Sequence, residues 1–292
     1  MPTAVATGTN PEVIVNRAIK NITALATLPE VTARIIAIVE NPRSSASSLH
    51  KIISHDPALV SRILKLVNSA FYGLPGQISS IDRAIVLLGL NAVKNVAVAA
   101  SLGQLFRGVK LCEGFTARDL WTHCIAVAVT ARELAKGLKI PLVDEAFLAG
   151  LIHDVGILVA LQVWPAKVQT VCTTVLEHGG DYCAAERLFL GVDHQMLGKA
   201  LAEKWKFPRT CQQAAGFHHA PRSLAEDSRL VVCLVHIADT ICCQAGIGFN
   251  LTARGQQLDA SILKEAGLDA AIIQKVTADI PTHVNDAVAM LG

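Results

Sequence analysis

Apolar side chains recur at intervals of three and four along most of the chain, the spacing that places them on one face of an α-helix. In the first hundred residues this spacing predicts helices at about 11–25, 30–40, 49–53, 57–67, 82–88 and 93–106, with Gly89-Leu90-Asn91 interrupting the last two. Asp56 and Pro57 support one of these helix starts, because aspartate is a good N-cap and proline suits the first helical position.

The same periodicity continues through a second part of the chain, which begins near Thr116. The helices predicted there cover 119–138, 145–156, 168–178, 182–190, 194–205, 208–218 and 230–245, with two amphipathic helices within 258–292. We expect Asp144, Asp193 and Asp227 to cap three of them. No stretch alternates polar and apolar residues over the length of a strand. The sequence therefore predicts an all-α fold, with an N-terminal helical lobe, 11–108, packed on a second helical lobe, 109–292.

Two runs, 146–164 and 230–253, are apolar enough to raise the question of a membrane span. Each contains a histidine and an aspartate, and an ionised acid inside a bilayer is costly. Apolar residues make up 52% of the chain and charged residues 17%, which leaves ample material for a large core. We therefore expect both runs to be buried helices and expect no membrane contact.

Charge and cysteine usage exclude further classes of protein. The net charge is +2 and the lysines and arginines are scattered, so no basic stripe for nucleic acid is present. The eight cysteines show no C-x-x-C spacing, and Cys242 and Cys243 are adjacent, which does not suit a disulfide scaffold. Residues 1–10 lack the basic and apolar regions of a secretory signal. We expect reduced thiols and a cytoplasmic location.

The stretch 146–159 contains His153 and Asp154 side by side in apolar surroundings, with Gly156 two residues later. These side chains are costly to bury unless they bind something, so the pair indicates a metal, a partner charge or a phosphate. Taken singly, any other histidine is better explained as an ordinary core or surface residue, and only the set together indicates a site. The further candidates are His123, His194, His218, His219, His236 and Asp239. Imidazole together with carboxylate suits iron, manganese, zinc or nickel rather than calcium.

Several short segments, in this order, resemble the signature of the HDOD domain, a bacterial signalling module related to the HD hydrolases. They are Leu28-Pro29, His55-Asp56-Pro57-Ala58-Leu59, and the stretches 66–73, 78–81 and 84–89. The resemblance continues through His153 and Asp154 to about residue 240. It implies an all-helical fold with an HD-like second lobe and a role in signal transduction through a partner protein.

The order His123, His153-Asp154, Asp239 resembles the H…HD…D metal signature of the HD phosphohydrolase superfamily. With His194, His218 and His219 it is similar to the two-metal set of the HD-GYP branch, whose members hydrolyse cyclic di-GMP. This resemblance implies that Asp154 bridges two metals. One metal would be held by His123, His153 and Asp239, and the other by His194, His218 and His219. Iron or manganese is expected first, with zinc and nickel as alternatives.

Asp119 and His236 are two further polar residues near this pattern. Asp119 falls where some of those proteins carry an additional acidic ligand, and it shares a helix face with His123. His236 has no counterpart in the pattern and is expected to be a buried helix histidine.

The sequence departs from HD-GYP proteins where they recognise phosphate. Those proteins carry a lysine after the glycine that follows the His-Asp pair, but here Ile157 follows Gly156. After the His-His pair they carry an acidic residue and Gly-Tyr-Pro, whereas Ala220-Pro221-Arg222-Ser223 stands here. Arg222 is a candidate replacement for the lysine, although an exposed loop arginine is more often solvated.

Three hypotheses follow, and none assigns a catalytic residue. The leading one is a non-enzymatic signalling module that retains a metal site and binds a signalling protein, with a cyclic dinucleotide not favoured as ligand. The second is a metal-dependent phosphohydrolase or phosphodiesterase that acts on a nucleotide or cyclic dinucleotide. The third is an unrelated helical scaffold with scattered histidines.

Overall fold

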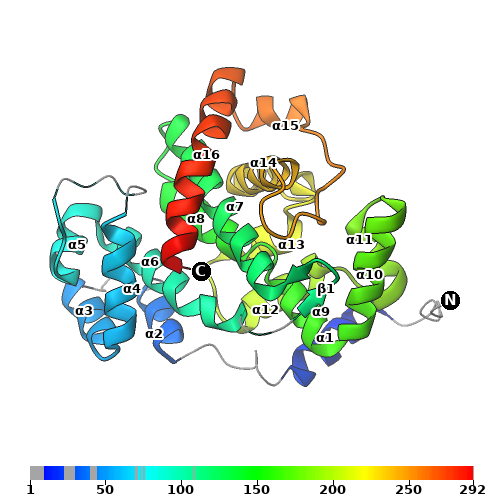
Figure 1. Cartoon of the computed structure of the whole chain (residues 1–292), viewed down its shortest axis with the longest axis horizontal. Helices are drawn as coiled ribbons and strands as arrows, with labels where there is room; N and C mark the ends of the chain where they lie inside the picture. Colours follow the sequence, from blue (N-terminus) through cyan, green and yellow to red (C-terminus); the bar gives the residue numbers. More distant parts are fainter. Residues whose placement is uncertain are drawn as a thin grey trace.

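The structure is a computed structural model that describes residues 10–22, 30–39, 45–69, 72, 74, 76–106, 108 and 110–291 (Figure 1). Its first helices are α1 (Pro11–Asn21), α2 (Glu30–Val39), α3 (Ala46–Ser54), α4 (Pro57–Val67), α5 (Ile81–Leu88) and α6 (Leu90–Leu102). Next come α7 (Ala117–Gly137), α8 (Val143–Ile152), α9 (Val155–Val163), α10 (Pro165–His178) and α11 (Tyr182–Leu190). The last are α12 (His194–Lys204), α13 (Arg209–Phe217), α14 (Leu230–Gln244), α15 (Ala260–Glu265) and α16 (Ala270–Leu291).

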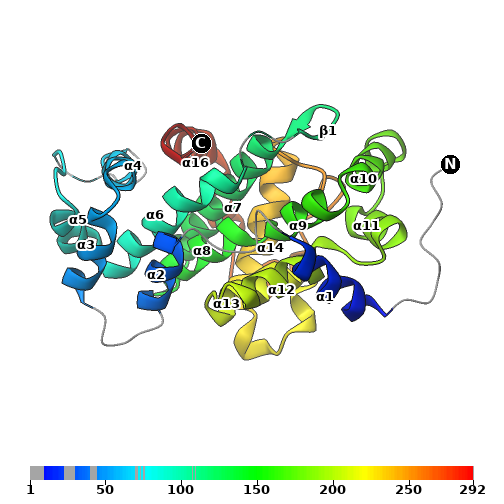
Figure 2. The ribbon, with the colours of Figure 1, turned by 90° about the horizontal axis from the view of Figure 1, so that it is seen from below.

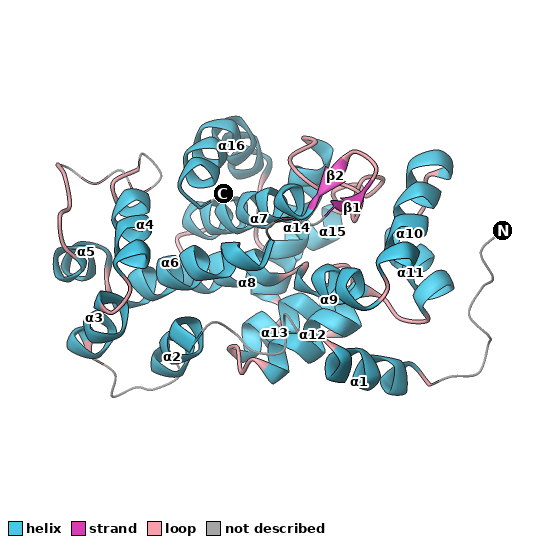
Figure 3. Ribbon diagram, turned by 60° about the horizontal axis from the view of Figure 1, so that its bottom comes forward, coloured by secondary structure: helices cyan, strands magenta, loops and turns pink. Residues whose placement is uncertain are grey.

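Helices make up almost all of the regular secondary structure among the described residues, so the predicted all-α class is confirmed (Figure 3). Short 3-10 turns lie at Gly103–Phe106, Pro221–Ser223 and Glu226–Ser228. One small hairpin, in which β1 (Lys110–Cys112) pairs antiparallel with β2 (Phe115–Thr116), interrupts the pattern. The hydrophobic periodicity did not predict this hairpin, because two- and three-residue strands are too short to show alternation.

Helices α2 to α6 form one lobe, at the left of Figure 1, and the helices from α7 onward form most of the other. Helices α2, α4 and α5 pack on α6, which is buried along nearly its whole length and also contacts α8. Helix α16 contacts both α7 and α4, and Trp121 Nε1 donates to the carbonyl of Leu291 at 2.9 Å. The two lobes are therefore packed on each other, as predicted.

Helix α1 lies away from α2–α5 and packs on α9 and α12 of the second lobe (Figure 2). Lys204 Nζ on α12 supports this contact by donating to the carbonyl of Ile19 at 3.1 Å. The division of the chain into 11–108 and 109–292 stays a prediction.

Part of the predicted family signature has a visible structural role at the end of α4. The Asn68 side chain donates to the Ile78 carbonyl at 2.8 Å and accepts from the Ile78 N–H at 2.6 Å. It also donates to the Leu64 carbonyl at 2.8 Å. Asn68 thus holds the chain that leads into α5 against α4. Leu28, Pro29, Ala70, Phe71 and Gly73 lie outside the described residues.

Some predicted helix ends were wrong. Asp144 lies inside the first turn of α8, whose N-cap is Leu142, and the N-cap of α14 is Arg229 rather than Asp227. The helix predicted to run to Gly156 stops at Ile152, and α9 starts at Val155. His153 and Asp154 therefore occupy a turn between two helices, which gives their side chains freedom to point into the interior.

The stretch Val143–Val163, which comprises α8, the turn and α9, is apolar and long enough to cross a membrane by composition. However, 89% of its most apolar window is buried inside the structure. The buried residues of α14 likewise include nearly every position from Val231 to Cys243. Both runs are thus core helices, as predicted from the acidic residue in each.

Candidate metal centre

Asp154 stands at the N-terminus of α9, but its side chain makes no capping bond there and remains available to other elements. Gly156, two residues on, allows α12 to come close. A Cβ at Gly156 would lie 1.9 Å from the His194 carbonyl oxygen and 2.6 Å from the Gly198 nitrogen. Because any larger residue would push α9 and α12 apart, this glycine brings His194 to Asp154.

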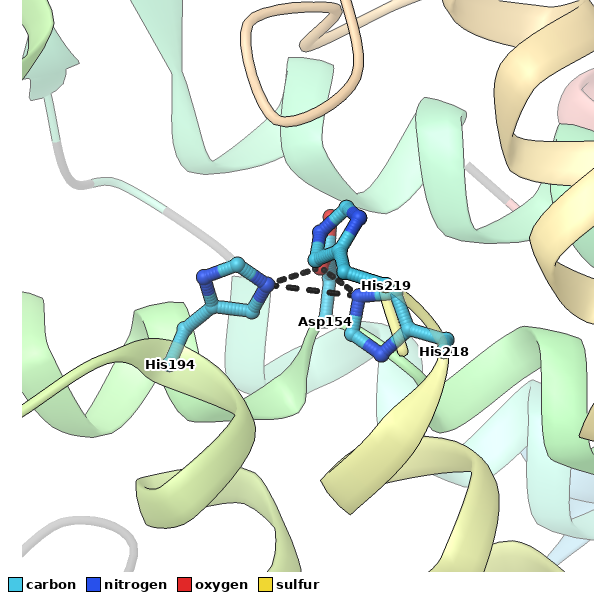
Figure 4. A group of neighbouring side chains, drawn as sticks. All are labelled: Asp154, His194, His218 and His219. Carbon is cyan, nitrogen blue, oxygen red and sulfur yellow. Dashed lines mark hydrogen bonds and ion pairs between the residues drawn. The ribbon is translucent and has the colours of Figure 1, made fainter. Parts of the chain in front are cut away.

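Three ligand-type atoms form a nearly equilateral triangle at Asp154 (Figure 4). Asp154 Oδ1 lies 3.3 Å from His194 Nε2 and 3.3 Å from His218 Nε2, and the two nitrogens are 3.3 Å apart. His219 joins the same group, and its ligand atom lies within 4.8 Å of the other three. Bonds of about 2.0–2.1 Å to one tetrahedral ion would place two ligand atoms about 3.3–3.4 Å apart. The triangle has the dimensions of a metal site.

A second group lies on the other side of the Asp154 carboxylate. Asp154 Oδ2 is 3.3 Å from His153 Nε2 and 3.8 Å from His123 Nε2. His123 Nε2 is in turn 3.1 Å from Asp239 Oδ1, and the ligand atoms of His123, His153 and Asp239 lie within 4.8 Å of one another. Each oxygen of Asp154 thus faces a different group of imidazoles, which is the arrangement expected of a carboxylate that bridges two cations.

The seven side chains come from α7, the α8–α9 turn, α12, the end of α13, and α14. Six of them are fully buried, and the His219 side chain is 11% exposed. The structure therefore brings all seven predicted ligands to one place. Their role as metal ligands stays a prediction.

Four of the rings are held by Nδ1, which leaves Nε2 to point inward. Since a carbonyl or carboxylate oxygen can only accept, Nδ1 carries the proton and Nε2 of a neutral ring presents its lone pair to the centre. The acceptors are the Ile247 carbonyl for His123 (3.3 Å), the Gly150 carbonyl for His153 (2.7 Å), the Ala214 carbonyl for His218 (2.9 Å) and Glu186 Oε2 for His194 (2.5 Å).

One of these acceptors depends on a second glycine. The backbone of Gly248 has φ +65°, and a Cβ there would lie 2.4 Å from the Asp119 carbonyl oxygen and 2.6 Å from the His123 nitrogen. The loop after α14 can therefore lie directly on α7. This contact brings the carbonyl of Ile247 to the His123 ring.

Several buried polar atoms of the centre lack a hydrogen bond of acceptable geometry. Among the described residues these are both carboxylate oxygens of Asp154, Asp239 Oδ2, His153 Nε2 and His219 Nε2. Leaving buried polar atoms without partners costs about 1–3 kcal/mol for each group, and more for a charged one. Divalent ions would satisfy these atoms together, so the residues present fit a two-metal centre.

The electrostatics of the centre differ from one imidazole to the next. Burial alone would raise the pKa of the Asp154 carboxyl, but His153, His218 and His194 outweigh burial and hold that pKa well below its ordinary value. Burial lowers the pKa of His218 and, together with the His218 ring, holds the pKa of His219 well below the usual range. The Asp154 carboxylate outweighs burial and raises the pKa of His153, and Glu186 does the same for His194. A metal ion would therefore displace a proton from each of these two rings, because ligation requires neutral imidazole beside ionised carboxylate.

Asp119 is not part of the centre. Its carboxylate accepts from the Thr116 N–H at 2.7 Å and the Thr116 hydroxyl at 2.6 Å, and so closes a capping box at the start of α7. The suggestion of a further acidic ligand is wrong here, because local capping already uses this side chain. His236 is a buried helix histidine, as predicted, and its Nδ1 bonds the carbonyl of His218 at 2.7 Å.

The two positions that differ from HD-GYP proteins contribute no cation to the centre. Ile157 is fully buried in α9. Arg222 is directed to α15, where it lies 3.3 Å from Glu265 and 2.5 Å from the Ser261 hydroxyl. Arg222 is therefore engaged on the surface and does not replace the missing lysine.

Sequence reasoning missed two residues that support the histidines. Glu186 is 1% exposed and accepts from both the ring and the backbone N–H of His194, while Gln195 Oε1 accepts from the His219 N–H at 3.0 Å. A signal for Glu186 was present, because it occupies a helix face between Tyr182 and Leu190, which are both buried.

Fold and site together define an all-helical protein with a buried histidine–aspartate centre. A family model of the HDOD domain matches residues 25–221, and the chain belongs to this family. Of the curated proteins, an uncharacterized protein of Treponema pallidum (strain Nichols) is 25% identical over 216 residues, which are 73% of this chain. The chain spans about two fifths of that relative, 41% of its length.

Solved structures share the fold over nearly the whole chain. An HDOD domain protein of unknown function from Geobacter sulfurreducens has a TM-score of 0.82 at 23% identity and covers 97% of this chain and 98% of its own. A proposed phosphohydrolase from Shewanella amazonensis SB2B has a TM-score of 0.76 at 27% identity, covering 96% and 98%. A proposed signal transduction protein from Marinobacter aquaeolei VT8 has a TM-score of 0.77 at 25% identity, covering 97% and 65%.

Proposed function

We propose that this protein is a cytoplasmic HDOD signalling module in which a two-metal centre holds the second lobe in the shape that a partner protein recognises. The observation that carries the proposal is Asp154, whose two buried oxygens face two separate groups of ligands and make no hydrogen bond of acceptable geometry. The relative whose name proposes signal transduction supports the signalling part.

In this proposal His123, His153 and Asp239 hold one metal ion, while His194, His218 and His219 hold the other. Asp154 bridges the two. Iron or manganese suits this mixture of imidazole and carboxylate, with zinc and nickel as alternatives. When bound, such a pair could polarise a phosphoryl oxygen and activate a water molecule.

A low catalytic activity follows from what surrounds the ligands. Phosphodiester hydrolysis also needs donors that hold the phosphate and stabilise its developing charge. Ile157 has no donor to offer, and Arg222 is engaged with Glu265 and Ser261. All ligands except His219 are fully enclosed, which also limits access of a substrate. We therefore assign the centre a structural role within a signalling protein.

One observation favours the second candidate, a metal-dependent phosphohydrolase. A cavity of about 470 Å³ adjoins His219, and Arg254 is among the residues that line it. This volume lies within the range of about 300–1,000 Å³ usual for small-molecule sites. The Shewanella amazonensis relative, whose name proposes a phosphohydrolase, supports the same candidate. A phosphate ester could reach the His219 side of the centre by this route.

Metal analysis of protein purified without a histidine tag tests the proposal, followed by an assay of cyclic di-GMP hydrolysis by protein loaded with iron or manganese. We expect up to two equivalents of metal and little or no product. Turnover near 1 s⁻¹ or faster, about the lower end of ordinary enzymes, would decide for the phosphohydrolase if Asp154→Ala abolished it. Protein that binds no metal under any loading condition would rule out the two-metal centre.

A further inference from the structure

Glu186 is an acidic residue in a position that helix packing would give to an apolar one. It lies on the buried face of α11 between Tyr182 and Leu190, and only 1% of it is exposed. An ionised carboxylate is rarely buried unless a partner compensates the cost of its desolvation. The partner of Glu186 therefore indicates why it is there.

That partner is His194, which Glu186 contacts twice through the same oxygen. Oε2 lies 2.5 Å from His194 Nδ1 and accepts the His194 backbone N–H at 2.9 Å. The first contact fixes the rotation of the ring and the second fixes the start of α12. With Nδ1 engaged, Nε2 is directed to Asp154 and His218, each 3.3 Å away.

The centre is asymmetric in this respect. His123, His153 and His218 are anchored by neutral backbone carbonyls, those of Ile247, Gly150 and Ala214. His194 is anchored by a carboxylate, whose negative charge makes the imidazole a stronger donor to a cation than a carbonyl does. A carboxylate thus supports one ring in the group of His194, His218 and His219. In the other group, the anchors of His123 and His153 are both neutral carbonyls.

Cys183 also lies near, and the three side chains Cys183, Glu186 and His194 could be taken for a third metal site. The distances argue against that interpretation. Two ligands of one ion lie about 3.3 Å apart, whereas Glu186 Oε2 and His194 Nδ1 are at the distance of a direct hydrogen bond. Cys183 Sγ is 4.0 Å from the same nitrogen.

We propose that Glu186 is a positioning residue that orients His194 and strengthens metal binding at the group of His194, His218 and His219. This inference rests on the proposed two-metal centre and adds a residue that touches neither metal. Losing such a supporting carboxylate typically weakens metal binding about 10- to 100-fold. The loss should concern one of the two metals and leave the other in place.

The test measures Mn²⁺ binding to the full chain by competition with a chelator, for the wild type and for Glu186→Ala and Glu186→Gln. We expect Glu186→Ala to bind one Mn²⁺ as the wild type does and the second about 10- to 100-fold more weakly. The electron paramagnetic resonance spectrum should show a spin-coupled Mn²⁺ pair in the wild type and an isolated Mn²⁺ ion in Glu186→Ala. Glu186→Gln keeps an acceptor for Nδ1 without the charge, so its loss of affinity should be smaller.

Asp193→Asn provides the matched control. Asp193 precedes His194 and caps α12 through the Met196 N–H at 3.0 Å, and asparagine can take over that cap. We expect wild-type Mn²⁺ affinity at both sites in this variant. If Asp193→Asn weakened the second metal as much as Glu186→Ala does, the effect would be general damage to α12, and the positioning role would be wrong.

Two other outcomes would also decide the matter. If the wild type bound two Mn²⁺ ions and both Glu186 variants bound them equally well, the positioning role alone would be wrong. If the wild type bound none, the proposed centre would fail together with it. Should Glu186→Ala not fold, the affinity of Glu186→Gln decides, because glutamine preserves the size of the buried side chain; an unchanged affinity in that variant would count against the inference.

Discussion

Gly156 lies so close to the carbonyl of His194 that a Cβ on this residue would be 1.9 Å from the oxygen. Helices α9 and α12 therefore meet backbone to backbone at the point where Asp154 and His194 approach each other at 3.3 Å. The packing of the helices and the geometry of the candidate centre are determined at the same contact.

The first prediction concerns this contact. Gly156→Ala should force α9 and α12 apart and lower the free energy of unfolding by about 3 kcal/mol, the upper part of the usual range for overpacking. It should also weaken binding of the metal at His194. Urea unfolding and metal analysis measure the two effects. Gly198→Ala is the control, because its nearest contact would be 3.3 Å and the loss should be smaller. Equal stability of the wild type and Gly156→Ala would contradict the close approach.

The second prediction concerns metal and stability. A ligand that binds only the folded protein stabilises it by about 2.7 kcal/mol when its free concentration is 100 times its Kd. We expect Mn²⁺ to raise the melting temperature of the wild type, chelator to reverse the rise, and Asp154→Ala to show no rise. Thermal unfolding with and without Mn²⁺ measures this. A rise of the same size in Asp154→Ala would mean that the ion binds elsewhere.

The third prediction separates Asp119 from the ligands. Asp119→Ala removes the capping box with Thr116 and should cost about 1 kcal/mol of unfolding free energy. Metal content should remain that of the wild type, because the carboxylate faces Thr116. Urea unfolding and metal analysis on the same preparation provide the answer. Loss of a metal ion from this variant would restore Asp119 as a ligand.

The fourth prediction concerns Asn68. Asn68→Ala leaves the Ile78 N–H without its acceptor and should lower the unfolding free energy by about 1–3 kcal/mol. Asn68→Asp keeps an acceptor for that N–H but loses the amide donor to the Leu64 and Ile78 carbonyls, so it should recover part of the loss. Equilibrium unfolding compares both with Gln77→Ala, an exposed neighbour. If all three variants were equally stable, Asn68 would not hold this segment.

The sequence predicted elements best where local chemistry alone decides them. Helix α11 has the predicted bounds, because Asp181 caps it through the Ala184 N–H and Gly191 ends it with a left-handed backbone, φ 81°. Asp193 caps α12 as expected from its place before His194. Each of these signals involves residues only a few positions apart, so it can be recognised in the sequence alone.

Features that depend on distant contacts were not predictable in the same way. Helices α8 and α9 are separated at His153 and Asp154, whose side chains face ligand-type groups on other helices. The apolar run around these two residues is continuous, so the sequence pattern did not show the break. Asp119 could be a cap or a ligand by spacing, and only the structure shows that it faces Thr116. Glu186 carried a signal on its helix face, but its partner, His194, lies on another helix.

The origin of the ligands also has a consequence for folding kinetics. They come from α7, α12, α14, the end of α13 and the α8–α9 turn, and only His153-Asp154 and His218-His219 are neighbours in the chain. An unfolded chain can therefore offer an ion little more than two adjacent ligands, and the full set exists only after α7, α12 and α14 have come together. Contacts that form after the transition state slow unfolding and leave the folding rate nearly unchanged. Bound metal would accordingly lengthen the lifetime of the folded protein without helping the chain to reach that state.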